Sequence, residues 1–233
     1  MVADMSKLSF SIGAIKRVAD KTDSVILFDS TGKDSLVTLD LIYPYFKRIV
    51  CVFMYFVKGL EHVDRYLRWT KARYPKVEIV QIPHWNLTYV LRGGLYCVPD
   101  PKMKLLKLKD IVYAMRLRFG IHYVFLGMKK ADSMNRRLML MTYQNCENNG
   151  LIYPLSEWTQ KDILAYMRQN NLPQPIRYNP DKPSSGVGLN LDCFLWMRKN
   201  APLDLQKVLK TFPMSERILD EYDYQQGKEK TNK

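Results

Sequence analysis

Closely spaced cysteines are missing from this sequence. Its four cysteines, Cys51, Cys97, Cys146 and Cys193, lie far apart, and no two of them form a C-x-x-C pair. Structural zinc sites and cysteine-ligated iron–sulfur clusters use closely spaced cysteines, so the spacing signals neither kind of site. We therefore expect isolated thiols, of the kind that are most often reduced core residues, and no iron–sulfur cluster.

Long apolar runs are absent as well. No stretch is long enough to span a bilayer, and residues 1–7 lack the apolar core of a secretory signal. These two absences predict a cytoplasmic protein that has no membrane partner. A hydrophobic content of 47% beside 25% charged residues is typical of a globular chain, and 233 residues can bury a sizeable core.

Negative charge is scarce relative to positive charge. The chain has 36 Lys and Arg residues against 23 Asp and Glu residues, which gives a formal net charge of +13. Such an excess favours a polyanionic partner, which is a nucleic acid, a nucleotide or an acidic protein. A solvated basic surface explains the charge equally well. Nucleic acid or another polyanionic partner is therefore left open, and so is a homodimer.

A strand, a polar turn and a helix follow one another near the start of the chain. Residues 25–28 form a short apolar run typical of a buried strand, residues 30–32 form a turn, and apolar residues resume at helical spacing from Leu36. The first amides of a helix have no intrahelical partner, and the helix dipole adds partial positive charge. This order of elements therefore predicts an anion site.

The side chains of the turn suit a bound phosphate. Gly32 lets a phosphate approach the backbone, and Lys33 supplies a full positive charge. Asp34 stands where the common phosphate loop has Ser or Thr, and a carboxylate there can hold Mg²⁺ or cap the helix. An ordinary strand-to-helix turn is the alternative. We predict a phosphate site made of Ser30, Thr31, Gly32, Lys33, Asp34 and Ser35.

A second polar turn follows a later strand. Residues 121–126 are predicted to be a strand, and the turn after it carries the basic residues Lys129, Lys130, Arg136 and Arg137. In a parallel sheet, ligands bind at the carboxyl ends of the strands, so this turn should open on the same edge as residues 30–35. Its cations can then neutralise phosphate charge. A solvated basic face is the alternative.

The order of the predicted elements gives the fold class. Strands alternate with helices, which predicts an α/β fold with a doubly wound, mainly parallel sheet and helices on both faces. We expect a nucleotide-binding domain at residues 1–175, a helical C-terminal extension packed on it at residues 176–226, and a disordered tail at residues 227–233. Residues 84–103 are expected to be an irregular loop, either a lid or a plain surface excursion.

Both polar turns resemble those of one family. The pattern Ser-x-Gly-Lys-Asp-Ser at residues 30–35 resembles the loop of the PP-loop ATP pyrophosphatases, within the adenine nucleotide α-hydrolase superfamily, and especially its phosphoadenylyl-sulfate (PAPS) reductase-like branch. That branch carries a Gly-x-Arg-x-x-x-Ser-x-x-Arg-like turn, which Gly127, Ser133 and Arg136 match. Lys129 replaces the usual arginine, which keeps the charge and loses the bidentate fork.

A third segment extends the resemblance. Residues 154–163 are similar to the family's Pro-Leu-x-x-Trp-x-x-x-Asp-Ile segment. Physically, Thr159 and Asp162 within it have the spacing of a capping box, which predicts the start of a helix. We interpret this segment as structural support for the site.

The resemblance implies an ATP-using enzyme. ATP would bind with its phosphates on residues 30–35 and with Mg²⁺ near Asp34, and an oxygen of the acceptor would attack the α-phosphate and expel pyrophosphate. Such a site acts by positioning and electrostatic stabilisation. The implied catalytic residues are Lys33, Asp34 and Arg136, and the nucleotide site is completed by Gly127, Lys129 and Ser133. The acceptor is either a nucleic-acid base carbonyl or a small molecule.

The chain also departs from the family's pattern. The reductases attack sulfur with a cysteine in a C-terminal Glu-Cys-Gly-like tail, whereas this chain has no cysteine after Cys193. Because a thiolate is the nucleophile in that step, its absence removes the step. The strand predicted at residues 48–56 ends without the acidic Asp-Thr-Gly-like turn that many members of the family have, so the adenosine contacts stay open, with Glu61 as a candidate. Two alternatives therefore remain: a PAPS reductase or sulfonucleotide-binding protein, and a non-catalytic nucleotide or nucleic-acid binding module.

Overall fold

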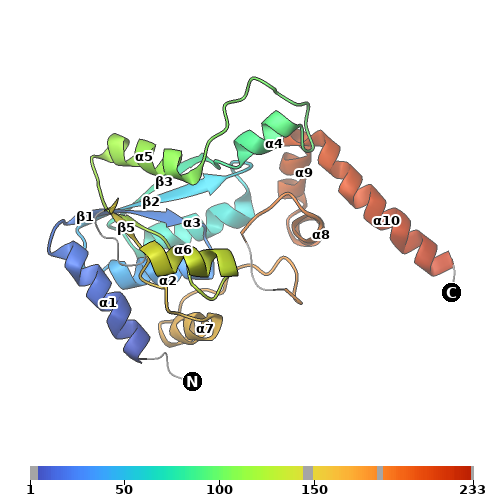
Figure 1. Cartoon of the computed structure of the whole chain (residues 1–233). Helices are drawn as coiled ribbons and strands as arrows, with labels where there is room; N and C mark the ends of the chain where they lie inside the picture. Colours follow the sequence, from blue (N-terminus) through green and yellow to red (C-terminus); the bar gives the residue numbers. More distant parts are fainter. Residues whose placement is uncertain (1–4, 144–148, 183–185, 232–233) are drawn as a thin grey trace. The chain divides into compact units, whose positions relative to one another are not determined.

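The computed structural model of the chain describes residues 5–143, 149–182 and 186–231 (Figure 1). The chain divides into two compact units. Unit 1 comprises Met1–Met54, Leu67–Ile82 and Lys109–Pro175, and unit 2 comprises Tyr55–Tyr66, Pro83–Leu108 and Ile176–Lys233. Unit 2 thus contains, besides the predicted C-terminal extension, two segments from within the predicted first domain.

Unit 1 is built on a parallel sheet. Within the described residues the sheet has five strands in the order β3-β2-β1-β4-β5. The central strand β1 pairs in parallel with β2 on one side and with β4 on the other, so that Leu27 lies opposite both Cys51 and Phe125. The strands are β1 (Ser24–Asp29), β2 (Arg48–Tyr55), β3 (Val77–Pro83), β4 (Val124–Phe125) and β5 (Leu151–Ile152).

Helices cover both faces of this sheet, which confirms the predicted fold class. On one side lie α1 (Met5–Ala19), α2 (Lys33–Ile42) and α7 (Gln160–Gln169), and on the opposite side lies α5 (Leu108–Phe119) (Figure 1). The remaining helices that contribute to unit 1 are α3 (Glu61–Arg73) and α6 (Met134–Tyr143). Alternate strand residues such as Val25, Leu27 and Cys51 join the core beneath the first three helices.

The helices of unit 2 come mainly from the end of the chain. They are α4 (Leu87–Gly93), α8 (Leu191–Asn200), α9 (Pro202–Thr211) and α10 (Glu216–Thr231), with a 3₁₀ turn at Pro213–Ser215. Pro202 is the first residue of α9, a position that has no need of a backbone N–H. Helix α10 includes residues 227–231 of the segment for which the sequence predicts a disordered tail.

Two elements differ from their predictions. Residues 84–103, which are expected to be an irregular loop, contain α4. Only Val124 and Phe125 of the strand expected at residues 121–126 make ladder pairs. Propensity and apolar patterning do not decide which residues find a ladder partner, so the ends of elements are poorly predicted. Within the described residues, no helix combines the length and apolar character needed to cross a bilayer.

The predicted capping box at the start of α7 is confirmed. Asp162 N–H donates to Thr159 Oγ1, and Asp162 Oδ2 accepts from the Thr159 N–H at 2.7 Å. Lys7 Nζ adds an ion pair to the same Asp162 oxygen at 2.7 Å. Two otherwise unpaired amides are thereby satisfied, and α1 is joined to α7.

We expect Thr159→Ala to lower the free energy of unfolding by about 1 kcal/mol, because the substitution removes the side-chain cap of α7. Lys161→Ala, at an exposed position in the same helix, is the matched control. Urea unfolding followed by circular dichroism measures both variants. Equal stabilities for the two variants would contradict the proposed contribution of the cap.

Candidate functional site

The polar turn between β1 and α2 is organised by Asp29, the last residue of β1. Its Oδ1 accepts hydrogen bonds from the Thr31 N–H at 2.7 Å and from the Ser35 hydroxyl at 2.8 Å. Thr31 has a φ of 54°, a left-handed conformation that costs energy for a β-branched residue, and the bond to Asp29 holds it. Burial raises the pKa of the Asp29 carboxyl, while the bonds from Thr31 and Ser35 act in the opposite direction.

Ser35 points back into the turn. Its hydroxyl donates to Asp29 and accepts from the Ser30 N–H at 3.2 Å, and only 4% of the residue is exposed. No side chain caps the N-terminus of α2, where Gly32 is the N-cap. The first amides of this helix are therefore left for a ligand, which is the geometry expected of an anion site. The sequence predicts that Ser35 belongs to the phosphate site, but in the structure its hydroxyl bonds to Asp29 and Ser30 within the turn.

Charged side chains from the two polar turns form an ion-pair chain. Lys33 Nζ lies 3.3 Å from Asp34 Oδ2, and Lys129 Nζ lies 2.7 Å from Asp34 Oδ1. The same Lys129 ammonium lies 2.9 Å from Asp132 Oδ1, and Arg136 Nη1 lies 2.5 Å from Asp132 Oδ2. The structure thus brings Lys33, Asp34, Lys129 and Arg136 together, as the sequence predicts for a shared site at one edge of the sheet.

The cations of this chain differ in exposure. Lys129 is 1% exposed and Lys33 is 9% exposed, whereas the Arg136 side chain is 48% exposed. A ligand can therefore contact Arg136 directly, while Lys129 acts mainly as a buried charge. Desolvation tends to raise the pKa of Asp132, but the hydrogen bond and charge of Lys129 and the bond from Arg136 outweigh it and hold that pKa below its usual value.

The carboxylate of Asp34 is not free to bind a metal ion directly. Both of its oxygens lie within ion-pair distance of an ammonium group, one of Lys33 and one of Lys129. A Mg²⁺ ion would have to displace a lysine or be held through water. Among the described residues, no group of three or more His, Cys, Asp and Glu side chains is placed to hold a metal ion. Ligation of Mg²⁺ by Asp34 stays a prediction.

Gly127 lets the second turn pack directly on the first. A Cβ atom at this position would lie 3.0 Å from the carbonyl carbon and oxygen of Asp34 and 3.2 Å from the Ser35 nitrogen. Those atoms are backbone atoms that cannot rotate away. A residue with any side chain here would therefore push α2 away from the second turn.

The remaining residues of the second turn have local roles. Ser133 Oγ accepts from the Arg136 N–H at 3.2 Å, at the start of α6. Lys130 Nζ forms an ion pair with Glu157, so Lys130 is drawn away from the ion-pair chain. Arg137 is exposed and follows Arg136 in the helix, which turns it by about 100°. Of the four basic residues in this turn, Lys129 and Arg136 are joined to the phosphate loop.

Asp29 and Asp132 are the site residues that sequence reasoning missed. An acidic residue at the end of an otherwise apolar strand was the available signal for Asp29, because such a carboxylate needs hydrogen-bond donors when it is buried. Asp132 gave no such signal, since an acidic residue in a basic loop is ordinarily solvated.

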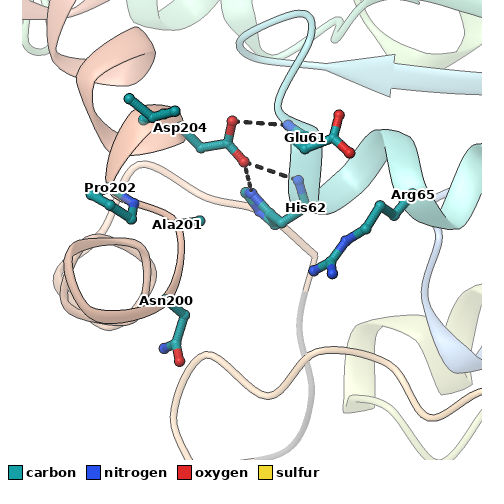
Figure 2. A pocket seen from close by; sticks show the side chains of 8 residues that line it. Glu61, His62, Arg65, Asn200, Ala201, Pro202 and Asp204 are labelled. Atoms are coloured by element: carbon teal, nitrogen blue, oxygen red, sulfur yellow. Dashed lines mark hydrogen bonds and ion pairs between the residues drawn. The ribbon is translucent and has the colours of Figure 1, made fainter.

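Unit 2 contains a second polar cluster, shown in Figure 2. Asp204, in the first turn of α9, accepts hydrogen bonds from the N–H groups of Glu61 and His62 at 2.8 and 2.9 Å, and from His62 Nδ1 at 2.6 Å. His62 Nε2 lies 3.1 Å from the Tyr178 hydroxyl. A pocket of about 360 Å³ lies beside this cluster, and Arg65 is among its lining residues.

This cluster is best explained as a structural network. His62 and Asp204 are each 2% exposed, and both ring nitrogens of His62 already have partners. Desolvation favours the protonated Asp204 carboxyl, but the bonds from His62 and Glu61 prevail and lower its pKa. Burial raises the pKa of Tyr178, so its hydroxyl is not activated as a nucleophile. The network fixes the start of α3 to the start of α9.

The described cysteines are free thiols. Cys51 and Cys193 are buried, and desolvation raises the pKa of both, so neither is a reactive thiolate at neutral pH. Cys97 is partly buried. Cys146 lies outside the described residues, so the absence of an iron–sulfur cluster stays a prediction.

Comparison with known proteins identifies a family. The family model described as the phosphoadenosine phosphosulfate reductase domain matches residues 24–180, which include both polar turns and the ion-pair chain. An adenosine 5'-phosphosulfate reductase from Geobacillus thermodenitrificans (strain NG80-2) is 24% identical over 170 residues, which cover 70% of this chain and 71% of that protein.

Two solved structures match the chain at low sequence identity. The phosphoadenylyl-sulfate (PAPS) reductase from Candida auris, in a phosphate complex, has a TM-score of 0.48 at 16% identity, and the match covers 70% of this chain and 81% of that chain. The U34-tRNA thiolase NcsA from Methanococcus maripaludis, with its [4Fe-4S] cluster, has a TM-score of 0.48 at 16% identity, covering 93% of this chain and 81% of that chain.

We expect Gly127→Ala to lower the free energy of unfolding by roughly 1–3 kcal/mol, because the new methyl group overlaps the backbone of Asp34. Gly13→Ala is the control, since a Cβ there meets only the end of the Arg17 side chain at 3.6 Å. Denaturant unfolding measures both variants. A Gly127→Ala protein as stable as the Gly13→Ala protein would show that the two turns are not in close contact.

Proposed function

Because the chain belongs to the family of the phosphoadenosine phosphosulfate reductase domain, we propose that its phosphate loop binds the phosphates of an adenine nucleotide. One observation carries this proposal. Lys33 is the first residue of α2, whose N-terminus has no side-chain cap, and the ion-pair chain brings two further cations, Lys129 and Arg136, to the same place. Free helix amides and positive charge together favour a phosphate ligand.

We further propose that the nucleotide is ATP and that the reaction is adenylation. An oxygen of the acceptor attacks the α-phosphorus, the bond from that phosphorus to the bridging oxygen breaks, and pyrophosphate leaves. The acceptor oxygen then carries the adenylyl group. The amides of α2 and Lys33 position the phosphates, and Arg136 offsets negative charge that develops on the departing pyrophosphate. Mg²⁺, if it enters with ATP, would supply further neutralisation of phosphate charge.

The arrangement of the ion-pair chain suggests how the site accommodates phosphate. In the structure, Asp132 holds the guanidinium of Arg136 by one carboxylate oxygen. An arginine can make two parallel bonds to a phosphate, so an incoming phosphate competes with Asp132 for this side chain. Asp132 thus keeps Arg136 near the loop until the nucleotide arrives. The acceptor is either a nucleic-acid base carbonyl, which the charge of +13 favours, or a small molecule.

A sulfonucleotide substrate is the second candidate, and the family match favours it. A relative is an adenosine 5'-phosphosulfate reductase, and the same phosphate loop would suit a sulfonucleotide. Two of the described thiols, Cys51 and Cys193, do not suit the reductase step, since they are buried and have raised pKa values. This candidate therefore amounts to sulfonucleotide binding, with reduction depending on a thiol other than Cys51 and Cys193.

The two candidates and a non-catalytic module are separated by thermal shift with ATP–Mg²⁺, AMP and phosphoadenylyl sulfate. A ligand that binds only the folded protein stabilises it by about 2.7 kcal/mol at a hundredfold excess over Kd. Adenylation predicts the largest shift with ATP–Mg²⁺ and pyrophosphate release on incubation. A largest shift with phosphoadenylyl sulfate would support the second candidate, and binding without turnover would support the non-catalytic module.

Lys33→Ala should reduce ATP-dependent pyrophosphate release by roughly a hundredfold or more, because it removes a charge that faces the phosphates. Asp34→Asn should be similarly damaging, since Lys129 then loses one of its two carboxylate partners. Lys47→Ala removes an equal charge at an exposed position of the same unit and is the control. Wild-type turnover in both site variants, with the fold intact by circular dichroism, would place the phosphate site elsewhere.

Arg136→Ala should weaken ATP binding at least about tenfold, because charge-assisted bonds to phosphate contribute roughly 1.5–3 kcal/mol each. Arg137→Ala changes the net charge equally but points away from the ion-pair chain, and should have little effect. Calorimetric titration of both variants at two salt concentrations tests this difference. If only Arg137→Ala is damaging, Arg137 is the ligand, and if neither is, the turn is a solvated face.

A further inference from the structure

A second pocket of unit 1 lies at the C-terminal ends of two helices. It has a volume of about 370 Å³, and its lining includes Leu8, Ile12, Asp40, Tyr45, Tyr166 and Asn170. Leu8 and Ile12 belong to α1, whereas the other four come from the last turns of α2 and α7 or the residues just after them. None of these residues takes part in the phosphate site.

The lining of the pocket includes the carboxylate of Asp40, whose two oxygens are bonded by tyrosine hydroxyls and not by a cation. Asp40 Oδ1 accepts from the Tyr74 hydroxyl at 2.8 Å, and Asp40 Oδ2 accepts from the Tyr166 hydroxyl at 2.7 Å. Among the residues that the structure describes, no Lys, Arg or His side chain forms an ion pair with Asp40, although Arg73 faces the Tyr74 hydroxyl. Burial raises the pKa of Tyr166, and the negative charge of Asp40 raises it further.

The surrounding backbone adds negative potential. Helix α2 ends at Ile42 and α7 ends at Gln169, so the carbonyl ends of both helices lie at this pocket. The C-terminus of a helix carries partial negative charge and favours a cation. In a protein of net charge +13, a carboxylate and two helix C-termini thus gather negative potential at this pocket, and Lys76, which lies outside the lining, is bonded to the carbonyl oxygens that follow α2.

The chain itself shows how a cation is held at this end of α2. Lys76 Nζ donates to the carbonyl oxygens of Tyr43 and Phe46 at 2.9 and 3.0 Å, and lies 4.2 Å from the centre of the Tyr43 ring. Carbonyl oxygens and an aromatic face thus bind one ammonium group just outside the pocket. Within the pocket, the lining offers groups of the same two kinds, oxygen acceptors on Asp40 and the aromatic ring of Tyr45.

We propose that this pocket binds an organic cation, namely a primary ammonium or guanidinium group on an aliphatic stem. The cationic head meets the Asp40 carboxylate between the rings of Tyr45 and Tyr166, and the stem lies against Leu8 and Ile12. A free polyamine and a lysine or arginine side chain of another protein share this chemistry. The site is independent of the proposed nucleotide reaction, because it uses none of the same residues.

The first test uses the wild-type protein without nucleotide. Butylamine and butan-1-ol have similar size and shape and differ in charge, and their binding is followed by amide chemical shifts of Tyr45 and Asn170. We expect saturable shifts with butylamine and at least about tenfold weaker binding of butan-1-ol, the difference that one charge-assisted contact makes. Equal binding of the two probes, or none by butylamine, overturns the proposal whatever the outcome with ATP.

The second test uses matched variants. Asp40→Asn keeps the shape of the side chain and an acceptor for a tyrosine hydroxyl but removes the charge, and should weaken butylamine binding about tenfold. Asp20→Asn makes the same change in net charge at an exposed position and should leave binding unchanged. If Asp20→Asn weakens butylamine binding as much as Asp40→Asn does, the amine responds only to the net charge of the protein, and the proposed site is wrong.

The source of the cation is then decided by two further probes. Spermidine represents a free polyamine, and the acetylated tripeptide Gly-Lys-Gly represents a side chain of a partner protein. Tighter binding of spermidine assigns the pocket to a polyamine, and tighter binding of the peptide assigns it to a protein partner. Both results support the cation site, provided that the difference in affinity between spermidine and the peptide disappears in the Asp40→Asn protein.

Discussion

The buried ammonium of Lys129 is the constraint on which the site depends. A charged group that is 1% exposed costs several kcal/mol unless it is paired, and its pairing requires Asp34 from α2 and Asp132 from the second turn. The two turns must therefore close on each other for Lys129 to be buried at all. Gly127 permits this contact by having no side chain. The phosphate loop and the basic turn are consequently one site rather than two neighbouring loops.

The parts of this site that could be predicted are those encoded over a few residues. Strand, turn and helix succeed one another within residues 24–42, so the anion site follows from local order and the geometry of helix amides. The capping box is equally local, because Thr159 and Asp162 satisfy each other. Joining Lys129 and Arg136 to the loop required only the rule that parallel strands end at one edge. The first two inferences used local spacing and geometry, and the third needed only that both strands belong to one parallel sheet.

What could not be predicted depends on partners that are distant in the sequence. His62 and Asp204 are 142 residues apart, and neither residue has a neighbour that signals the pairing. Asp132 is an exception, because its partners Lys129 and Arg136 are only three and four residues away, and what the sequence did not show is that Lys129 is buried there. The length of β4 is similar: residues 121–126 have strand propensity, but only two of them find ladder partners. Strand propensity is a property of a single residue, whereas ladder pairing also requires a second strand at the right position.

Helix direction connects the phosphate site with the proposed cation site. In a parallel α/β unit, a helix that follows a strand runs back across the sheet, so its N-terminus lies at the ligand edge and its C-terminus at the other. Helix α2 has 10 residues, which corresponds to a length of about 15 Å, and it carries the phosphate loop at one end and Asp40 near the other. One helix can therefore favour an anion at its start and a cation at its end.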